Sequence, residues 1–204
     1  GGLAGALLGG LYSDLRRPTR ELAASAAALR AGVGVPEIVA VRATHVAGPF
    51  WKFTVVTREI EGAADLLALA ESSLSFSRKR DVIGRVADEI RRLHEAGVYH
   101  ADLTLKNILL SGPDVYIIDL DKAVLAGRRA EALDVMNLAR LNRSVEKLLG
   151  GRGFVTRADK LRFLRRYLGG RARLKELARL CDGGLWLHRL WWSLTGQAGL
   201  PRTR

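Results

Sequence analysis

Residues 99–121 constrain the fold more than any other part of the chain. They read YHADLTLKNILL and, after the turn SGPD, VYIIDLD. Ile108, Leu109 and Leu110 begin an aliphatic run that is typical of a buried strand, and a second apolar run follows the turn. The segment therefore predicts a polar loop, a strand, a tight turn and a second strand that ends in acidic residues.

An amphipathic helix is expected just before this segment. Residues 81–96 read DVIGRVADEIRRLHEA and place five aliphatic residues on one helical stripe, with Gly97 directly after the end. They are Val82, Ile83, Val86, Ile90 and Leu93. A polar loop held between a packed helix and a buried strand is a rigid support for chemistry.

The polar residues of the segment have the spacing used for phosphoryl transfer. In kinases an aspartate accepts the proton of the attacking hydroxyl, and an asparagine five residues later and an aspartate after the next strand hold magnesium. Asp102, Asn107 and Asp119 match these positions, and oxygen ligands suit such hard cations. His100 matches the histidine that opens the loop and packs beneath the metal-binding turn. An isolated D-x-x-x-x-N is common by chance and can be a plain polar turn, but this setting makes it specific.

The remaining elements indicate a mixed α and β chain. Residues 18–32 predict a helix with Pro18 in its first turn, and residues 37–44 and 51–58 predict two strands joined by a turn. Residues 62–74 predict a short helix. The chain from about residue 130 onward predicts helices, which the short segment AVLAGRRAEALDV reaches without a long activation segment.

Length and composition agree with one folded domain, or one domain with a small extra lobe. The chain has 204 residues, of which 48% are hydrophobic and 26% charged. Cys181 is the only cysteine, so a disulfide framework is excluded and a reducing compartment is expected. No apolar run approaches the ~20 residues that span a bilayer. The opening GGLAGALLGGLY has five glycines and no basic start, so we do not expect a signal peptide.

Positive charge is concentrated in residues 140–179. The net charge of the chain is +12, and this segment holds thirteen basic residues against Glu146, Asp159 and Glu176. Such a segment favours phosphate-bearing partners, although a solvated arginine-rich helix face would give the same composition. The basic residues are Arg140, Arg143, Lys147, Arg152, Arg157, Lys160, Arg162, Arg165, Arg166, Arg171, Arg173, Lys175 and Arg179.

Taken together, HADLTLKNILL, VYIIDLDKA and NLARLNRSVEKLL resemble the lipopolysaccharide kinases, and most closely the bacterial 3-deoxy-D-manno-octulosonic acid (Kdo) kinases. The match of Asp119-Leu120-Asp121 to the Asp-hydrophobic-Asp metal motif of that group supports the resemblance. RPTREL, TREIEGAADLL and TRADKLRFLRRYL are also similar, so the resemblance covers nearly the whole chain. The catalytic motifs are shared with other small-molecule kinases, and the segments beyond residue 136 make the resemblance more specific.

The resemblance implies a set of site residues. Asp102 would be the catalytic base, with Asn107 and Asp119 as Mg²⁺ ligands. Glu21 would pair with an ATP-binding lysine, although a surface role on its helix is also open. The stretch from Thr57 to Glu61, including Glu59 and Ile60, would be the hinge that holds adenine. Lys106 could offset the charge of the transferred phosphate or could be an ordinary exposed lysine.

One departure from the kinase pattern concerns the nucleotide-binding strands. Kinases place a glycine-rich turn and a strand lysine before the glutamate-bearing helix. GGLAGALLGG does not fit G-x-G-x-x-G, and the first lysine of the chain is Lys52. We expect GGLAGALLGG to be the connection into the first helix. The chain would then begin just after these strands, either because upstream residues are missing or because it is a remnant with impaired ATP binding.

The expected fold is α+β and protein-kinase-like, with a truncated N-lobe in residues 1–61 and a mainly helical C-lobe in residues 62–204. The resemblance implies ATP- and Mg²⁺-dependent transfer of the γ-phosphoryl group to a hydroxyl of Kdo on a lipid A precursor. It also implies a monomer at the cytoplasmic face of the inner membrane of a Gram-negative bacterium, or in its cytoplasm.

Two other classes stay open. One is a phosphotransferase for an aminoglycoside, choline or another sugar, although the basic C-terminal half argues against cationic substrates. The other is a catalytically impaired kinase-like binding protein with a basic face. No aromatic stacking motif for RNA is present, so no nucleic-acid partner is expected.

The segment GGLWLHRLWWSLTG (183–196) predicts a surface for membranes. Trp186, Trp191 and Trp192 lie at helical spacings after the basic segment, and tryptophan prefers the membrane–water interface. Closing the core of the C-lobe is an equally good role for these tryptophans.

Overall fold

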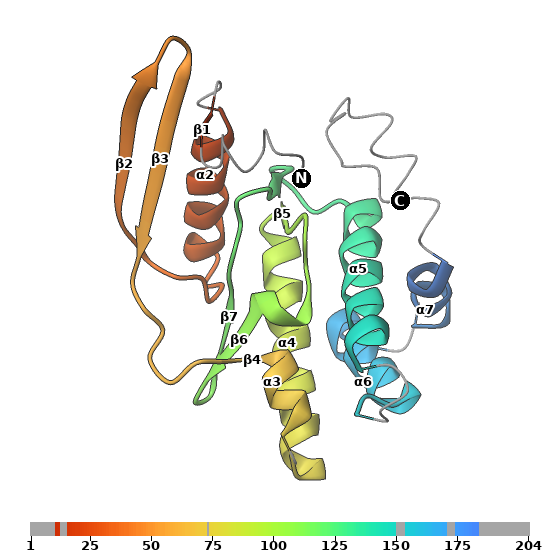
Figure 1. Ribbon diagram of the computed structural model, residues 1–204. Coiled ribbons are helices and arrows are strands. Elements are labelled where there is room, and N and C mark those ends of the chain that lie inside the picture. Colours follow the sequence, from red (N-terminus) through yellow and green to blue (C-terminus); the bar gives the residue numbers. More distant parts are fainter. Residues whose placement is uncertain (1–10, 13–15, 73, 150–153, 171–173, 184–204) are drawn as a thin grey trace.

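The computed structural model describes residues 11–12, 16–72, 74–149, 154–170 and 174–183 (Figure 1). Within them the strands pair antiparallel in small sheets, ordered β1–β3–β2, β4–β6–β7 and β5–β8. The elements are β1 (Leu11–Tyr12), α2 (Arg16–Arg30), β2 (Ile38–Ala47), β3 (Phe50–Thr57), β4 (Ala64–Asp65), α3 (Leu66–Glu71), α4 (Phe76–Glu95), β5 (Val98–Tyr99), the 3₁₀ turn η1 (Leu105–Asn107), β6 (Ile108–Ser111), β7 (Asp114–Ile117), β8 (Val124–Leu125), α5 (Glu131–Leu149), α6 (Arg157–Leu168) and α7 (Leu174–Gly183). The expected α+β class is confirmed.

Helix α2 ends where the sequence predicts and packs into the core. Ala24 and Ala28, one turn apart, are fully buried, and α2 packs against β5 and β8. Gly32 has φ +70°, and the next amide, of Val33, donates to the carbonyl of Ala28 at 3.0 Å. This is a left-handed helix end of the kind that favours glycine. A lobe division at residue 61 stays a prediction, and these contacts join α2 to strands beyond it.

Gly34 lies where two parts of the chain approach closely. A Cβ at this position would lie 2.1 Å from the carbonyl oxygen of Val115 in β7. The Gly34 amide donates to Glu89 of α4 at 2.6 Å, and its carbonyl accepts from Ile117 at 2.8 Å. The segment after α2 is therefore fixed between α4 and β7, and only glycine fits there.

The β2–β3 hairpin extends from one side of the molecule (Figure 1). Its register runs from Ile38 opposite Thr57 to Ala47 opposite Phe50, with Gly48 in the turn at φ +52°. Almost all of β2 is exposed, and β3 alternates between exposed and half-buried residues. The two predicted strands and their turn are confirmed, with β2 ending three residues later than expected.

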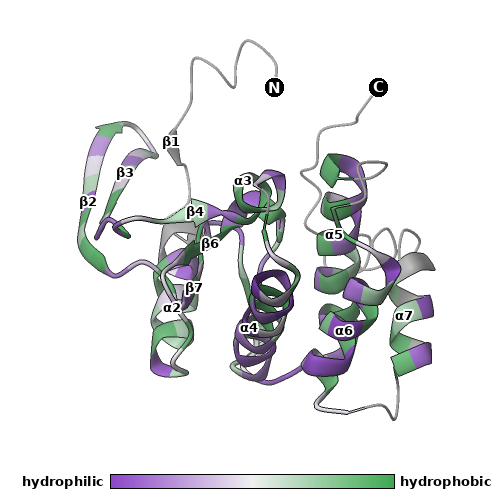
Figure 2. Cartoon of the chain, turned by 90° about the horizontal axis from the view of Figure 1, so that it is seen from below, coloured by the Kyte–Doolittle hydropathy of each residue, from purple (hydrophilic) through white to green (hydrophobic). Residues whose placement is uncertain are grey.

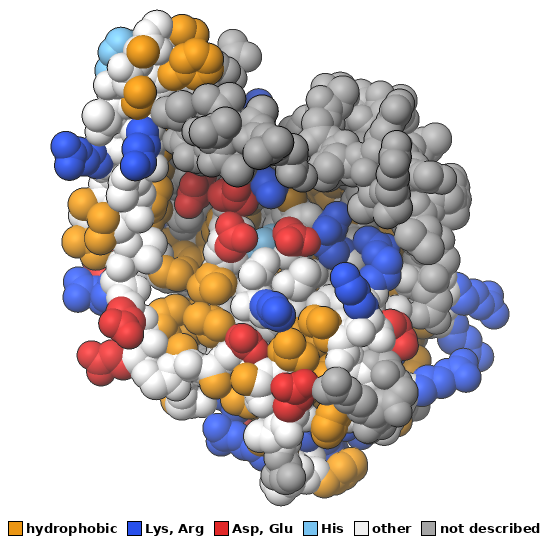
Figure 3. All heavy atoms as spheres, viewed as in Figure 1, with side chains coloured by type: hydrophobic (Ala, Val, Ile, Leu, Met, Phe, Trp, Pro, Cys, Tyr) orange, Lys and Arg blue, Asp and Glu red, His pale blue; other side chains and the backbone are white. Residues whose placement is uncertain are grey.

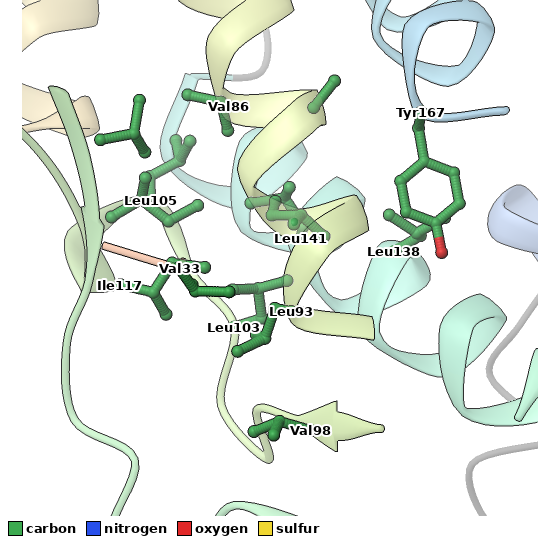
Figure 4. Packing of buried hydrophobic residues seen from close by; sticks show 14 of the residues in the cluster. Val33, Val86, Leu93, Val98, Leu103, Leu105, Ile117, Leu138, Leu141 and Tyr167 are labelled. Atoms are coloured by element: carbon green, nitrogen blue, oxygen red, sulfur yellow. The ribbon is translucent and has the colours of Figure 1, made fainter. Parts of the chain in front are cut away.

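Helix α4 is the central helix of the core. It begins at Phe76, five residues before the predicted start, because Ser75 caps it by accepting the Arg78 amide at 3.3 Å. Four residues of the predicted stripe are buried, namely Val82, Val86, Ile90 and Leu93. Figure 4 shows Val86 and Leu93 among apolar side chains from several elements, including Val33, Leu103, Leu105, Ile117, Leu138 and Leu141.

The helix predicted over 62–74 is wrong at its start. Ala64 and Asp65 instead pair with Leu110 and Leu109 of β6 as the strand β4. The Asp65 side chain then caps α3 by accepting the Ala68 amide at 2.7 Å. An aspartate before an apolar run is a helix-start signal, and it places the helix beginning after residue 65.

The C-terminal part is helical, as predicted. In α6, Thr156 and Asp159 form a capping box, and Gly169 ends the helix at φ +69°. Figure 2 shows hydrophilic residues along much of α4 and α6. The tryptophan-bearing segment after Gly183 lies outside the described residues. None of the helices that the structure describes is long and apolar enough to cross a membrane.

Candidate functional site

The residues predicted to carry chemistry meet in the loop of residues 100–107, which we call the Asp102 loop. It connects β5 to β6. The Asn107 side-chain amide donates to the Asp102 carbonyl at 2.9 Å, and the Asn107 carbonyl accepts the Ile118 amide at 3.0 Å. Asn107 therefore closes the loop and ties it to the residue before Asp119.

His100 makes hydrogen bonds both to Asp102 and to the residue before Asp119. Its ring is 1% exposed, Nε2 donates to the Ile118 carbonyl at 2.8 Å, and Nδ1 accepts the Asp102 amide at 3.0 Å. These partners assign the neutral ring with the proton on Nε2. Burial lowers the pKa of His100, which the hydrogen bond to Ile118 only partly offsets. His100 thus bridges the Asp102 amide and the carbonyl of Ile118, the residue before Asp119.

Asp119 has an unusual backbone. Its φ of +64° is the only positive φ outside glycine among the described residues. Such backbones are strained and cluster at functional sites. Asp119 is exposed, but partial desolvation, together with the neighbouring Asp121, raises its pKa.

This donor set fits Mg²⁺. Two neighbouring carboxylates, Asp119 and Asp121, favour a bound cation, and the Asn107 side-chain oxygen remains available because its amide nitrogen makes the bond to Asp102. No group of three or more His, Cys, Asp or Glu residues able to hold a metal occurs in the described part of the chain. That is compatible with Mg²⁺, which typically uses one or two carboxylates and completes its shell with water and substrate phosphates.

Helix α5 holds the Asp102 loop through three side chains, which we call the α5 stripe. Asn137 accepts the His100 amide at 2.9 Å, and Ser144 accepts the Leu105 amide at 3.1 Å. Between them Arg140 forms an ion pair with Asp102, with Nη1 2.8 Å from Oδ1. Positions i, i+3 and i+7 share one helix face, so a single face of α5 contacts the loop along its length.

A buried polar network extends from the stripe into the core. His94 donates from Nε2 to Asn137 Oδ1 at 3.3 Å and accepts the Tyr167 hydroxyl at Nδ1 at 2.8 Å. Arg129 donates to both Tyr167 and Asp134. Burial lowers the pKa of His94 to about 4 despite the nearby Asp134 carboxylate. A neutral His94 therefore links α6 to Asn137 and, through it, to His100.

Lys106 lies in the same loop as Asp102. It is exposed and forms no ion pair with any residue that the structure describes. Figure 3 shows acidic side chains gathered near the middle of one face, with Lys and Arg side chains next to them.

The predicted nucleotide residues lie at the junction of β3 and β4. Thr57 ends β3, Glu59 is exposed, and the half-buried Ile60 accepts the Ala63 amide at 3.3 Å. Glu59 makes no hydrogen bond to another described residue, so its backbone groups are available to a ligand. Glu21 is half-buried on α2.

An apolar cavity in the described region is lined by neither Asp102 nor Asp119. Its volume is about 430 Å³, and it is enclosed by α3, α4, α5, α6 and α7. Leu105, Leu141, Val145 and Phe163 are among its lining residues. Its mainly aliphatic lining does not suit proton transfer.

Comparison with known proteins defines the class. A solved structure described as WaaP in complex with acyl carrier protein is similar to this chain, with a TM-score of 0.65 and 28% identity. The match covers 86% of this chain and 75% of the other. The predicted protein-kinase-like fold is confirmed.

The family follows from the sequence. The model of the Lipopolysaccharide kinase (Kdo/WaaP) family matches residues 12–167, and the chain belongs to this family. The curated 3-deoxy-D-manno-octulosonic acid kinase of Photobacterium profundum is 33% identical over 157 residues, which are 74% of this chain and 64% of that protein. The enzyme of the same name from Vibrio cholerae is 36% identical over 124 residues, or 60% and 50% of the two chains. The chain thus spans about half to two thirds of the length of these relatives.

Three residues of the site were not predicted as such from the sequence. Asn137, Arg140 and Ser144 lie in the segment NLARLNRSVEKLL, which contributed to the resemblance, but no role followed for them. Their i, i+3, i+7 spacing places three polar residues on one face of the helix. That spacing was the available signal.

Proposed function

We propose that this protein transfers the γ-phosphoryl group of ATP to a hydroxyl of a Kdo residue on a lipid A precursor. The observation that carries the proposal is the Asp102 loop. His100, Asn107 and the α5 stripe fix its backbone, while the Asp102 carboxylate stays 56% exposed. An exposed carboxylate on a rigid backbone suits a general base that must meet a substrate hydroxyl.

In the proposed reaction Asp102 accepts the proton of the acceptor hydroxyl as its oxygen attacks the γ-phosphorus in line. The bond from phosphorus to the bridging oxygen of ADP breaks, and ADP leaves. The exposed ammonium of Lys106 lies in the same loop and offsets charge on the transferred group. Arg140 holds Asp102 Oδ1, which leaves Oδ2 to receive the proton.

Asn107 and Asp119 would hold Mg²⁺, which when bound neutralises the β- and γ-phosphates. The positive φ of Asp119 directs its carboxylate from the turn that His100 supports. Adenine would bind the backbone of Thr57, Glu59 and Ile60. Glu21 on α2 would pair with an ATP-binding lysine. In this proposal residues 1–61 form the partial N-lobe and residues 62–204 the C-lobe.

A monomer bound peripherally to an anionic membrane is the setting we propose, at the cytoplasmic face and without a nucleic-acid partner. Several arginines of the basic segment are already paired, such as Arg162 with Asp159 and Arg166 with Asp88. Arg165 is exposed and has no partner among the described residues. Each basic residue near an anionic surface contributes about 1 kcal/mol.

Arg165→Gln should therefore weaken sedimentation with anionic liposomes at low salt, while Arg42→Gln on the hairpin should not. Equal binding to neutral and anionic vesicles would contradict this setting.

The test of the proposed reaction is a transfer assay with the full-length protein, Mg-ATP and a Kdo-bearing lipid A precursor. Mass spectrometry should show one added phosphate on the Kdo-bearing lipid, with little ATP consumption on an aminoglycoside or choline. Preferential transfer to either of those would make the protein a different small-molecule kinase. Mg-ATP binding without transfer to any acceptor would make it a kinase-like binding protein.

A further inference from the structure

Arg143 is a half-buried cation without an anion among the described residues. It lies on α5 one turn after Arg140 and next to Ser144, which holds the Leu105 amide. Within the described part of the chain it makes neither a hydrogen bond nor an ion pair. Burial and the neighbouring Arg140 lower the pKa of Arg143. Removing a guanidinium partly from water without an opposite charge is unfavourable.

Several other cations of the same region are compensated, whereas Lys147 and Arg165, which have no partner among the described residues, are exposed. Lys160 pairs with Glu146, Arg162 with Asp159, and Arg166 with Asp88. Arg140 is engaged by Asp102 at 2.8 Å. Two arginines at i and i+3 repel each other, and the Asp102 carboxylate pairs with Arg140 rather than with Arg143. The arrangement is unfavourable in the free protein and becomes favourable when an anion binds beside Asp102.

The position restricts which anion this is. Arg143 follows Arg140, the partner of Asp102, by one helical turn, so a group bound between the two arginines would lie near the hydroxyl that Asp102 would deprotonate. The proposed acceptor is a sugar acid, and its carboxylate is part of the same residue as that hydroxyl. A planar guanidinium binds a carboxylate through two parallel hydrogen bonds, which also fixes its orientation.

We propose that Arg143, next to Arg140, binds the carboxylate of the acceptor sugar acid and so orients its hydroxyl toward Asp102. This inference rests on the proposed function and assigns the acceptor side of that site. A phosphate of the lipid or the γ-phosphate of ATP offers similar oxygens, and the experiment separates these sources.

The experiment compares Arg143→Gln with Lys147→Gln in the full-length protein. Lys147 is exposed one turn further along α5 and forms no pair with described residues, so its variant removes the same charge away from the loop. A hydrogen bond to a charged group contributes about 1.5–3 kcal/mol, so Arg143→Gln should raise KM for the Kdo acceptor roughly 10- to 100-fold. KM for ATP should stay unchanged. The KM of Arg143→Lys for the Kdo acceptor should lie between those of the wild type and Arg143→Gln.

An acceptor whose Kdo carboxylate is converted to the neutral amide identifies the ligand group. Wild type should show a raised KM for the amide, and Arg143→Gln should raise it no further. An equal effect of Arg143→Gln on both acceptors would assign the residue to a lipid phosphate and overturn the inference. A raised KM for ATP alone, or an effect no larger than that of Lys147→Gln, would overturn it as well.

Calorimetry with free 3-deoxy-D-manno-octulosonic acid separates this inference from the reaction. If the wild type binds the acid, Arg143→Gln does not, and no transfer occurs, then the carboxylate site stands and the proposed function fails. If transfer occurs with unchanged KM in Arg143→Gln, then the function stands and the carboxylate site fails.

Discussion

The Asp102 loop and the β2–β3 hairpin are held in opposite ways. The loop has little regular structure, yet His100 within it and Asn137, Arg140 and Ser144 on one face of α5 fix its backbone and its aspartate. The hairpin has a regular ladder, but β2 is almost entirely exposed. Regular secondary structure therefore does not indicate where this molecule is rigid. The proposed chemistry lies where side-chain contacts to a distant helix determine one geometry.

The largest effect is expected at the metal position. Asp119→Ala should weaken Mg²⁺-dependent ATP binding at least about 100-fold, because even outer-shell partners of metal ligands typically contribute 10–100-fold. Calorimetry with Mg-ATP measures this. The control is Asp114→Ala, since Asp114 is exposed at the start of β7. Unchanged affinity in Asp119→Ala would remove the metal role.

Breaking the support of the Asp102 loop should be the next largest effect. Asn137→Leu keeps the volume but leaves the buried donors of His94 and His100 without their acceptor. Each such donor costs about 1–3 kcal/mol, so urea unfolding should show a loss of roughly 3 kcal/mol. Thr54→Val on exposed β3 should change less than about 0.5 kcal/mol. Equal losses for both variants would erase the contrast between the two regions.

The network behind the loop should make stability depend on pH. The folded-state pKa of His94 is about 4, below the ordinary value of 6.5, so the unfolded chain binds more protons between these values. The stabilisation is complete above pH 6.5 and is lost as the pH falls toward 4. Between pH 7 and 4.5 the loss should be about 2 kcal/mol from this group.

His94→Gln should remove that part of the pH dependence, and chemical denaturation at both pH values measures it. His45→Gln is the control, because His45 is exposed on the hairpin and bonds only the nearby Gly48 carbonyl. A pH dependence in His94→Gln equal to that of the wild type would show that His94 titrates normally.

The smallest effects should fall on the outer face of the hairpin. Val39 is 58% and Val41 is 41% exposed, so Val39→Thr and Val41→Thr should each cost less than about 0.5 kcal/mol. Differential scanning of the full-length protein checks this. A loss above about 1.5 kcal/mol in either variant would mean that this face is packed against another part of the protein.

The sequence predicted what depends on local pattern. The stripe of α4, the hairpin, the Asp102 loop and its following strands all follow from periodicity and turn residues. The α5 stripe did not, because its hydrogen bonds join residues 37 to 39 positions apart and depend on how α5 packs. The roles given to Asp102, Lys106, Asn107, Asp119, Glu21 and the residues around Thr57 remain predictions.

The basic segment, residues 140–179, also has contacts that the sequence alone did not predict. Its excess of positive charge is plain in the sequence, but its partners include Asp88 and Asp102, which lie far outside it. Pairing with these acids reduces the charge that faces solvent. Arg143 differs from the paired Arg140, Arg162 and Arg166 because it is half-buried and has no anionic partner among the described residues. Composition alone does not show this difference.

The most direct test of the account is single-turnover transfer by Asp102→Asn in the full-length protein. The amide keeps the size of the side chain and can no longer accept the proton, and a general base contributes roughly 10²–10⁴-fold. The account predicts a loss of transfer in that range, with Mg-ATP affinity and thermal stability close to those of the wild type. Transfer at the wild-type rate would contradict it.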